Sequence, residues 1–210
     1  MNIMSSILLD FDGVIIQNKN IASFVATKSE QFIAKKYNLS CRESKKVNTV
    51  FYKTHGHTAI GIDPKKYREH ILEYNDYVFS NINYSSLKHM ITKQDEYNLT
   101  KLVCKNAIKK YGLFTNAPLT WCENICWMGN VDIYDFIEDT QCFTSDDGLI
   151  KPKKHIYDYV ESELINDKTI YFVDDNKMNF DEIATNDRWR TFLFKPNQMD
   201  IHSVLKGLVS

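Results

Sequence analysis

Acidic side chains occur as two close pairs, one near the start of the chain and one in its last third. Asp10 and Asp12 lie at the end of a short apolar run, residues 6–11, and Asp174 and Asp175 follow a second such run. Carboxylates that share a pocket repel one another, so a cation is needed if all of them are to stay ionised. Oxygen ligands with positions left for water suit Mg²⁺. A carboxylate beside such an ion can attack phosphorus and form an aspartyl phosphate.

Hydrogen-bond donors at two further positions suit an anionic group. Thr115 and Asn116 follow the apolar run 111–114, and Lys151 lies in the loop after a third run. A hydroxyl and an ammonium group can together bind a phosphoryl group. Each pattern alone is common in turns and helix caps. Their occurrence together, each at the end of a predicted strand, is what indicates a phosphate site.

Short apolar runs alternate with helical patterns over most of the chain. Strands are expected at 6–11, 111–114, 141–143, 169–173 and 190–194, and helices at 98–110, 118–129, 153–164, 177–186 and 199–208, with a short helical turn at 132–138. Repeated units of strand and helix favour a parallel sheet with helices on both faces. Ligands of such sheets bind at the carboxyl ends of the strands. The acidic pairs, the hydroxyl and the lysine should therefore meet in one crevice.

Residues 17–95 break this alternation because only helical periodicity occurs there. Apolar side chains recur at helical spacing in two stretches: Ile21, Phe24, Val25, Phe32 and Ile33, then Tyr67, Ile71, Leu72 and Val78. Asp63-Pro64 is a typical helix start, with Asp as the cap and Pro in the first turn. The segment is too long for a simple crossover. We therefore expect a helical domain, called the insert (17–95), within an α/β core formed by 1–16 and 96–210.

The overall composition is that of an ordinary globular protein. The 210 residues include 26 basic and 27 acidic side chains, for a formal net charge of −1. This balance argues against a broadly basic protein that binds nucleic acid polymers. No stretch approaches the roughly 20 apolar residues of a transmembrane helix, and no basic segment of a signal peptide precedes the first apolar run. We expect a cytoplasmic protein with no membrane partner, and the oligomeric state stays open.

The five cysteines and a tryptophan pair are expected to be structural. An odd number of cysteines without a secretion signal favours free thiols in a reducing compartment. Cys122 and Cys126 lie four residues apart on a predicted helix, and no further zinc ligands follow at a standard spacing, so core packing is expected. Trp121 and Trp127, on the same helix, are expected to pack or to form an interface rather than to take part in catalysis.

The motifs, in this order, resemble those of the haloacid dehalogenase-like (HAD) hydrolase superfamily. The resemblance covers 5–16 and 98–194, and the matching stretches are Ile-Leu-Leu-Asp10-Phe-Asp12-Gly-Val, Gly-Leu-Phe-Thr115-Asn116, Lys151-Pro152 and Phe-Val-Asp174-Asp175-Asn-x-x-Asn179. It implies a Rossmann-like parallel sheet with a C1-type helical cap inserted between the first and second motifs. It also implies a Mg²⁺-dependent phosphatase that acts on a small phosphorylated metabolite.

The resemblance assigns a role to each catalytic and phosphate-binding residue. Asp10 would be the nucleophile, and Asp12 would protonate the leaving group and then activate water. Thr115, the amide of Asn116 and Lys151 would hold the transferring phosphoryl group.

The resemblance also implies which groups hold magnesium. These would be Asp10, the backbone carbonyl of Asp12, and the final acidic pair. Asp175 would be the direct ligand of that pair, and Asp174 would act through water.

The middle of the insert is similar to the cap of the pyrimidine 5′-nucleotidase branch. The stretch that carries the likeness is Phe51-Tyr52-Lys-x-His55-Gly-His57-Thr58, followed by Gly61 and Asp63-Pro64-x-x-Tyr67. It implies a nucleoside 5′-monophosphate as substrate, with Tyr52, His55 and His57 as cap residues that contact it. Two features depart from that branch: Gly13-Val14-Ile15-Ile16 stands where a Thr and an aromatic are usual, and Asn176 stands in place of a Ser.

Two patterns in the insert have alternative interpretations. Phe51 and Tyr52 can stack on a base or form part of the insert's own core. His55 and His57 have the spacing of a metal pair, but a third ligand is not evident nearby, so a substrate contact or an exposed loop is favoured.

Other functions stay open at the level of sequence. A phosphosugar or phosphoglycolate-type phosphatase, a phosphomutase, and a catalytically idle protein that binds a nucleotide or a partner are the alternatives. A haloacid dehalogenase is disfavoured because it lacks the second aspartate, whereas Asp12 is present. A receiver domain of a signalling relay has similar groups, but their order differs and it has no long helical insert.

Overall fold

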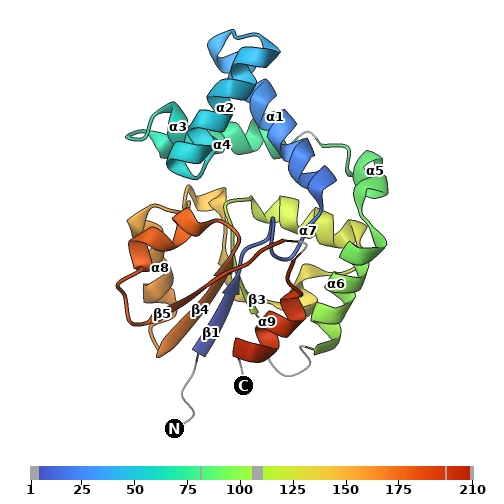
Figure 1. The fold of residues 1–210 in the computed structure, drawn as a ribbon, viewed down its shortest axis with the longest axis vertical. Helices are drawn as coiled ribbons and strands as arrows, with labels where there is room; N and C mark the ends of the chain where they lie inside the picture. Colours follow the sequence, from blue (N-terminus) through green and yellow to red (C-terminus); the bar gives the residue numbers. More distant parts are fainter. Residues whose placement is uncertain (1–4, 81, 106–110, 197, 209–210) are drawn as a thin grey trace.

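A five-stranded parallel sheet forms the centre of the molecule (Figure 1). The computed structural model describes residues 5–80, 82–105, 111–196 and 198–208. The strand order is β3-β2-β1-β4-β5, and the strands are β1 Ser5–Leu9, β2 Tyr111–Phe114, β3 Ile137–Phe143, β4 Thr169–Asp174 and β5 Trp189–Leu193. Each neighbouring pair is parallel. The predicted α/β fold with a parallel sheet is confirmed.

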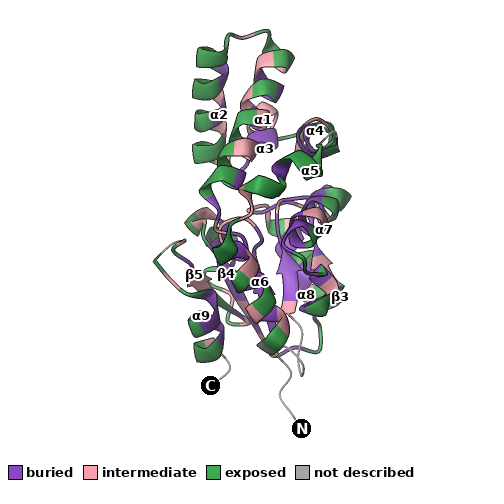
Figure 2. Cartoon of the chain, turned by 90° about the vertical axis from the view of Figure 1, so that its right-hand side faces the viewer, coloured by how far each residue is buried: buried purple, intermediate pink, exposed green. Residues whose placement is uncertain are grey.

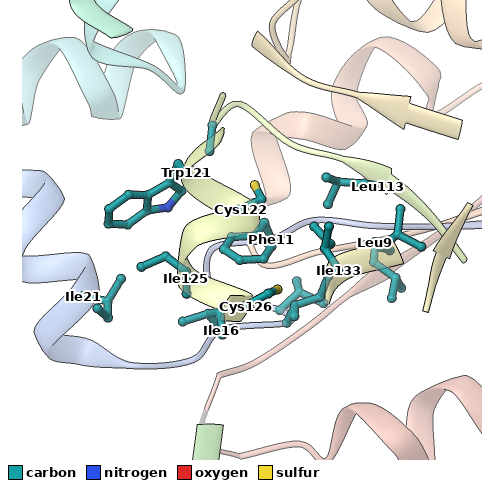
Figure 3. Close-up of a cluster of buried hydrophobic side chains, with 14 of the residues drawn as sticks. Leu9, Phe11, Ile16, Ile21, Leu113, Trp121, Cys122, Ile125, Cys126 and Ile133 are labelled. Atoms are coloured by element: carbon teal, nitrogen blue, oxygen red, sulfur yellow. The ribbon is translucent and has the colours of Figure 1, made fainter. Parts of the chain in front are cut away.

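Helices cover both faces of this sheet. Successive side chains of β1 point to opposite faces, so each face has its own apolar cluster. Ile7 and Leu9 join a large apolar cluster, while Leu8 joins a second one with Phe172. The elements packed around the sheet are α6 Lys93–Lys105, α7 Leu119–Met128, α8 Lys154–Glu163, the 3₁₀ segment η5 Lys177–Ile183 and α9 Ile201–Leu208. Figure 3 shows Cys122 and Cys126 of α7 among the side chains of the large cluster. Both are fully buried free thiols, as core packing predicts.

Several core elements differ from the sequence prediction, and one of them is α6, which begins at Lys93 rather than at 98. β3 begins at Ile137 rather than 141, and the expected turn at 132–138 is only η3, Ile133–Asp135. The polar residues at 138–141 concealed this strand, because an edge strand can expose polar side chains that a central strand cannot. The helix expected at 177–186 is the shorter 3₁₀ segment η5. Of the helix expected at 98–110, residues 106–110 lie outside the described residues.

The insert lies over the end of the sheet toward which the strands point (Figure 1). Its elements are α1 Lys19–Tyr37, α2 Cys41–His55, α3 Thr58–Ile62, α4 Tyr67–Asn75, the π-helical segment η1 Asp76–Ser80, α5 Tyr84–Leu87 and η2 Lys88–Met90. α1 and α2 form a hairpin that projects away from the sheet (Figure 2). Within the described ranges, no helix has the length and apolar character needed to cross a membrane.

Local capping explains where the insert helices begin and end. Asn38, in the left-handed conformation, ends α1, and Ser40 and Glu43 form a reciprocal capping box at the start of α2. The helix expected to begin at Asp63-Pro64 begins instead at Tyr67. The carboxylate of Asp63 accepts a hydrogen bond from the amide of Lys65 (2.9 Å), which makes a turn between α3 and α4.

Burial inside the insert follows the predicted pattern with one exception. Ile21, Phe32 and Ile33 of α1 are buried, as is Ile71 of α4. Leu72 was expected on the same buried face but is 56% exposed. The helix of residues 67–75 passes into a π-helical segment at Asp76, so a single helical period across 67–78 does not apply.

The chain passes between the insert and the sheet at two adjacent points, which a polar latch joins. Asn18 donates from Nδ2 to the carbonyl of Met90 (2.5 Å) and to Oδ2 of Asp95 (2.8 Å), while its Oδ1 caps α1. Asp95 also accepts hydrogen bonds from the amide and the hydroxyl of Thr92. Both Asn18 and Asp95 are buried. The entry and the exit of the insert are therefore bonded to each other.

Candidate active site

The predicted site residues follow three neighbouring strands at their carboxyl ends. Asp10 follows β1, which lies between β2 and β4 in the sheet. Thr115 follows β2, Asp174 ends β4, and Lys151 enters from the loop after β3. The sheet order brings these residues to one crevice, and the insert lies above it (Figure 1).

Lys151 forms the buried centre of the site. Its side chain is fully buried, and Nζ donates hydrogen bonds to the carbonyl of Phe114 (2.8 Å) and to Oδ2 of Asp174 (2.6 Å). Nζ also lies 3.2 Å from Oδ1 of Asp10 and 5.0 Å from the ring centres of Phe114 and Phe172. Burial alone would lower the pKa of Lys151, but the charges of Asp10 and Asp174 outweigh it and raise the pKa. The lysine is therefore a fixed positive charge between two carboxylates.

Asp10 is held in place by a backbone donor and by Lys151. Its Oδ1 accepts a hydrogen bond from the amide of Phe11 (2.8 Å), and the residue is buried. Burial raises the pKa of Asp10 well above its ordinary value, Lys151 opposes this, and the charges of Asp174 and Asp175 add to it. A second cation at this position would favour the ionised form.

Three carboxylates at the strand ends could hold such a cation. Asp10, Asp174 and Asp175 each offer an oxygen, and these atoms lie within 4.8 Å of one another. Both oxygens of Asp174 already accept hydrogen bonds from Lys151, Asn179 and the Asn176 amide. Asp175 is more exposed, and partial burial with the charge of Asp174 raises its pKa to about 6. A crowded set of hard oxygen donors fits Mg²⁺.

Gly13 makes room for this carboxylate cluster. Its φ is +93°, a conformation that favours glycine, and its amide donates to the carbonyl of Ile16 (2.8 Å). A Cβ at this position would overlap the carboxylate of Asp175. Gly13 therefore allows a tight turn after Asp12 and the close approach of Asp175, the residue that follows β4.

Asp12 does not belong to the carboxylate cluster, and its carboxylate is paired with a tryptophan of α7. Its Oδ1 accepts a hydrogen bond from Nε1 of Trp121 (3.4 Å), a fully buried side chain on α7. Burial raises the pKa of Asp12 to about 6, the Trp121 hydrogen bond opposes this, and the charge of Asp175 adds to it. The sequence predicted that Trp121 packs or forms an interface and takes no part in catalysis. The available signal was its place in the first turn of the helix that follows Thr115 and Asn116.

The loop after β2 is joined to the loop after β3. Asn116 donates from Nδ2 to the carbonyl of Lys151 (3.0 Å), and the amide of Lys151 donates to Oδ1 of Asn116 (2.8 Å). Thr115 is buried, and its Oγ1 accepts a hydrogen bond from the amide of Ala117 (3.2 Å). The side chain of Asn116 therefore positions the backbone of Lys151, a function that sequence reasoning did not assign to it.

Tyr52 is an insert aromatic whose phenol is influenced by the charges of the carboxylate cluster. It lies on α2 and is 52% exposed. Partial burial raises the pKa of its phenol, and the charges of Asp175, Asp10 and Asp174 add to this. Its neighbour Phe51 instead packs within the insert, where a Cβ on Gly61 would overlap its ring.

The two histidines of the insert differ in their surroundings. His57 is buried, its Nδ1 accepts a hydrogen bond from the amide of Ala59 (3.1 Å), and its ring centre lies 4.9 Å from that of Tyr74. Burial lowers the pKa of His57 to about 3, so the ring is neutral and caps α3. His55 is half-buried in the last turn of α2. Neither belongs to the carboxylate cluster found among the described residues.

The insert touches the rim of the site through small and polar contacts. A Cβ on Gly56, at the end of α2, would lie 3.2 Å from Cδ of Pro152, the residue after Lys151. Asn75 donates from Nδ2 to Oγ of Ser145 (2.8 Å), and the hydroxyl of Tyr67 lies 2.8 Å from Nε2 of His155. These contacts hold the insert over the carboxyl ends of the strands.

Fold and site together define a parallel α/β protein with a carboxylate cluster under a helical insert. A HAD phosphatase from Thermococcus onnurineus has a similar structure, with a TM-score of 0.57 and 15% identity over 98% of both chains. This likeness shows that the chain has the HAD-like fold, as the motifs predicted.

Other comparisons are weaker. A hydrolase from Streptococcus pneumoniae TIGR4 aligns over 100% of both chains with a TM-score of 0.48 and 15% identity. A haloacid dehalogenase-like protein of unknown function from Agrobacterium tumefaciens str. C58 aligns over 97% of this chain and 98% of that one, with a TM-score of 0.45 and 12% identity. No protein-family model matches the sequence, and no curated protein matches it either.

Proposed function

We propose that the protein is a magnesium-dependent phosphatase of the HAD superfamily that hydrolyses a small phosphomonoester through an aspartyl phosphate. One observation carries this proposal. Three carboxylates, those of Asp10, Asp174 and Asp175, meet within 4.8 Å beside the buried cation of Lys151. Such a cluster suits a second cation and an anionic substrate, and a phosphoryl group between two cations satisfies both.

Asp10 and Asp12 divide the chemistry between them. An oxygen of Asp10 attacks phosphorus, the bond from phosphorus to the leaving oxygen breaks, and Asp12 gives that oxygen a proton. A water molecule then attacks the aspartyl phosphate and loses a proton to Asp12, which releases phosphate and restores the Asp10 carboxylate. The pKa of Asp12, about 6, supports both steps because the group can hold and regain a proton near neutral pH.

Donors around Asp10 would hold the phosphoryl oxygens. The hydroxyl of Thr115, the backbone amide of Asn116 and the ammonium group of Lys151 are proposed for this role. Mg²⁺ would be held by the carboxylates of the cluster and the backbone carbonyl of Asp12, and it would supply positive charge against the phosphoryl oxygens. Lys151 also keeps the Asp10 oxygen oriented, since Nζ lies 3.2 Å from it.

We infer that residues 17–95 form a cap that closes over a core formed by 1–16 and 96–210. Polar contacts between them at the rim of the site, such as Asn75 to Ser145, can separate and re-form when the cap moves. Closure excludes water while the aspartyl phosphate forms. A cytoplasmic location agrees with the five free cysteines, which suit a reducing compartment.

A nucleoside 5′-monophosphate is the substrate that we propose. The half-exposed ring of Tyr52 lies on α2, its phenol is influenced by the charges of the three carboxylates, and the ring could stack on a base. His55, in the last turn of the same helix, is the second proposed contact. His57 is not included, because its ring already caps α3 and packs on Tyr74.

A phosphate-release assay tests this function. The substrates are p-nitrophenyl phosphate, uridine, cytidine and purine monophosphates, a sugar phosphate and phosphoglycolate, each with Mg²⁺ and with EDTA. We expect phosphate release that needs Mg²⁺. This release should disappear in Asp10→Asn, while the melting temperature of that variant stays unchanged. No release from any substrate in either condition would refute the proposal. Equal slow rates on every substrate would refute the nucleotide preference alone.

A further inference from the structure

Trp121 contacts both the insert and Asp12, the proposed acid. It lies in the first turn of α7, on the sheet side of the molecule, and its side chain is fully buried. Three aromatic residues of the insert surround its ring: Phe24 of α1, Phe79 of η1 and Tyr84 of α5. Figure 3 shows Trp121 on α7 at the side of the cluster that faces α1 and Ile21.

The three insert rings lie at different distances and angles from the ring of Trp121. The ring of Phe24 is nearly parallel to that of Trp121, with an angle of 4° and a centre-to-centre distance of 6.4 Å. Phe79 lies closer, at 5.2 Å, and Tyr84 lies at 6.2 Å. Three elements of the insert therefore contact one side chain of the core. A movement of the insert would remove these rings from Trp121.

The polar edge of the same ring reaches Asp12. A buried indole N–H needs an acceptor, and Nε1 of Trp121 donates to Oδ1 of Asp12 at 3.4 Å. Asp12 does not belong to the carboxylate cluster formed by Asp10, Asp174 and Asp175, and its Oδ1 is paired with Trp121 instead. Packing alone would explain the burial of the ring, but it would not require the N–H to face this carboxylate.

We propose that Trp121 is a positioning residue that orients the Asp12 carboxylate for proton transfer, and that the insert aromatics keep Trp121 in place when the cap is closed. This inference rests on the proposed role of Asp12 as the acid. It adds a link between cap closure and the acid, because the insert rings are the groups that fix the indole. An open cap would leave Asp12 less well oriented before the substrate is enclosed.

The dependence of rate on the leaving group tests this role. A nitrophenolate leaves with little help from an acid, whereas phenolate and alkoxide need a proton. The experiment measures kcat/KM with Mg²⁺ for p-nitrophenyl, phenyl and glycerol phosphates, in the wild type and in Trp121→Phe. Phenylalanine keeps an aromatic ring for the insert contacts but has no N–H. Trp127→Phe is the matched control, because Trp127 is on the same helix and 67% exposed.

We expect Trp121→Phe to lose about tenfold in kcat/KM on phenyl and glycerol phosphates and less than about threefold on p-nitrophenyl phosphate. Asp12→Asn should show the same trend with larger losses, and Trp127→Phe should match the wild type. A uniform loss on all three substrates, or none, in a folded Trp121→Phe would overturn the proposal.

A second variant covers the case in which Trp121→Phe does not fold. Phe24→Leu removes the parallel ring from the half-buried face of α1, and it should raise the leaving-group dependence in the same direction. A uniform effect of this variant would overturn the proposal. The failure of the proposed function is a separate outcome: the wild type would release no phosphate, or Asp12→Asn would behave as the wild type.

Discussion

Asn116 and Lys151 exchange two hydrogen bonds, one in each direction between the side chain of Asn116 and the backbone of Lys151. The two residues come from different loops, which follow β2 and β3. The pair therefore fixes the distance between the loop after β2, which is proposed to bind phosphate, and the lysine that lies 3.2 Å from Asp10. The backbone of Lys151 is held from one side while its ammonium group is held from the other.

Asn116→Ala should weaken both stability and turnover. The backbone N–H and carbonyl of Lys151 would each lose a partner, at a cost of about 1–3 kcal/mol in the free energy of unfolding. Urea denaturation measures this cost, with Asn20→Ala as the control because Asn20 is exposed. A denaturation midpoint equal to that of the wild type would show that the two hydrogen bonds do not join the loops.

Gly13→Ala should lose binding of magnesium. The positive φ of Gly13 costs a non-glycine residue about 1–3 kcal/mol, and the new methyl group would displace the carboxylate of Asp175. Calorimetric titration with Mg²⁺ measures the affinity. Gly207→Ala is the control, since it lies in α9 with no atom within 4 Å of an added Cβ, and it should raise helix stability by up to about 1 kcal/mol. Equal Mg²⁺ affinity in Gly13→Ala would contradict the proposed site.

Magnesium should stabilise the protein more strongly as the pH rises. The pKa values of Asp12 and Asp175 are raised from an ordinary 3.8 to about 6, so the folded protein binds their protons more tightly than the unfolded chain does. The stability that these protonated groups contribute is present below pH 4 and is lost as the pH rises through 6. Mg²⁺ favours the ionised forms and should reverse this loss.

The measurement for this prediction is the difference in melting temperature between Mg²⁺ and EDTA at several pH values from 4.5 to 7.5. The difference should grow through pH 6 and should be smaller in Asp175→Asn. A difference that stays constant across this range would exclude linkage to these carboxylates.

His57 should make the protein less stable in acid. Burial lowers its pKa from 6.5 to about 3, so the unfolded chain takes up a proton that the folded protein does not. Stability is therefore lost as the pH falls from 6.5 toward 3, by at most about 1.4 kcal/mol per pH unit. His57→Asn can still cap α3 but does not titrate. The free energy of unfolding of this variant should fall less steeply between pH 6 and 4.

His89→Asn provides the comparison, because His89 is exposed. In His89→Asn, the change in the free energy of unfolding between pH 6 and 4 should match that of the wild type. If His57→Asn and His89→Asn behave alike, the histidine of the α3 cap does not carry the acid sensitivity.

Central strands were predictable from the sequence, and so was the edge strand β5, which is observed at Trp189–Leu193 against a prediction of 190–194, but the bounds of the other edge strand, β3, were not. Tyr111–Phe114 is observed at its predicted bounds because an apolar run ends there at polar residues. β3 extends over polar residues from 137 because only part of an edge strand is covered. The bounds of η5 also differ, since Asn176 caps a short 3₁₀ segment whose length depends on its packing.

The core of the site was predictable because strand order alone brings the motif residues together. Asp10 and Asp174 follow neighbouring strands, and the parallel sheet places both at the same edge. Trp121 could not be assigned to Asp12 in this way, since the direction of a helix side chain toward a loop depends on tertiary packing. The same applies to His57, whose spacing from His55 does not show which ring turns inward.

The latch between Asn18 and Asp95 has a consequence for how such a chain could diversify. Because the two crossings are hydrogen-bonded neighbours, everything between them could be exchanged as a cassette without changing the distance that the sheet must span. A short linker in place of residues 19–91 would join ends that already touch. One catalytic platform could in this way acquire different selectivities, while the groups that carry out the reaction stay where the strands put them.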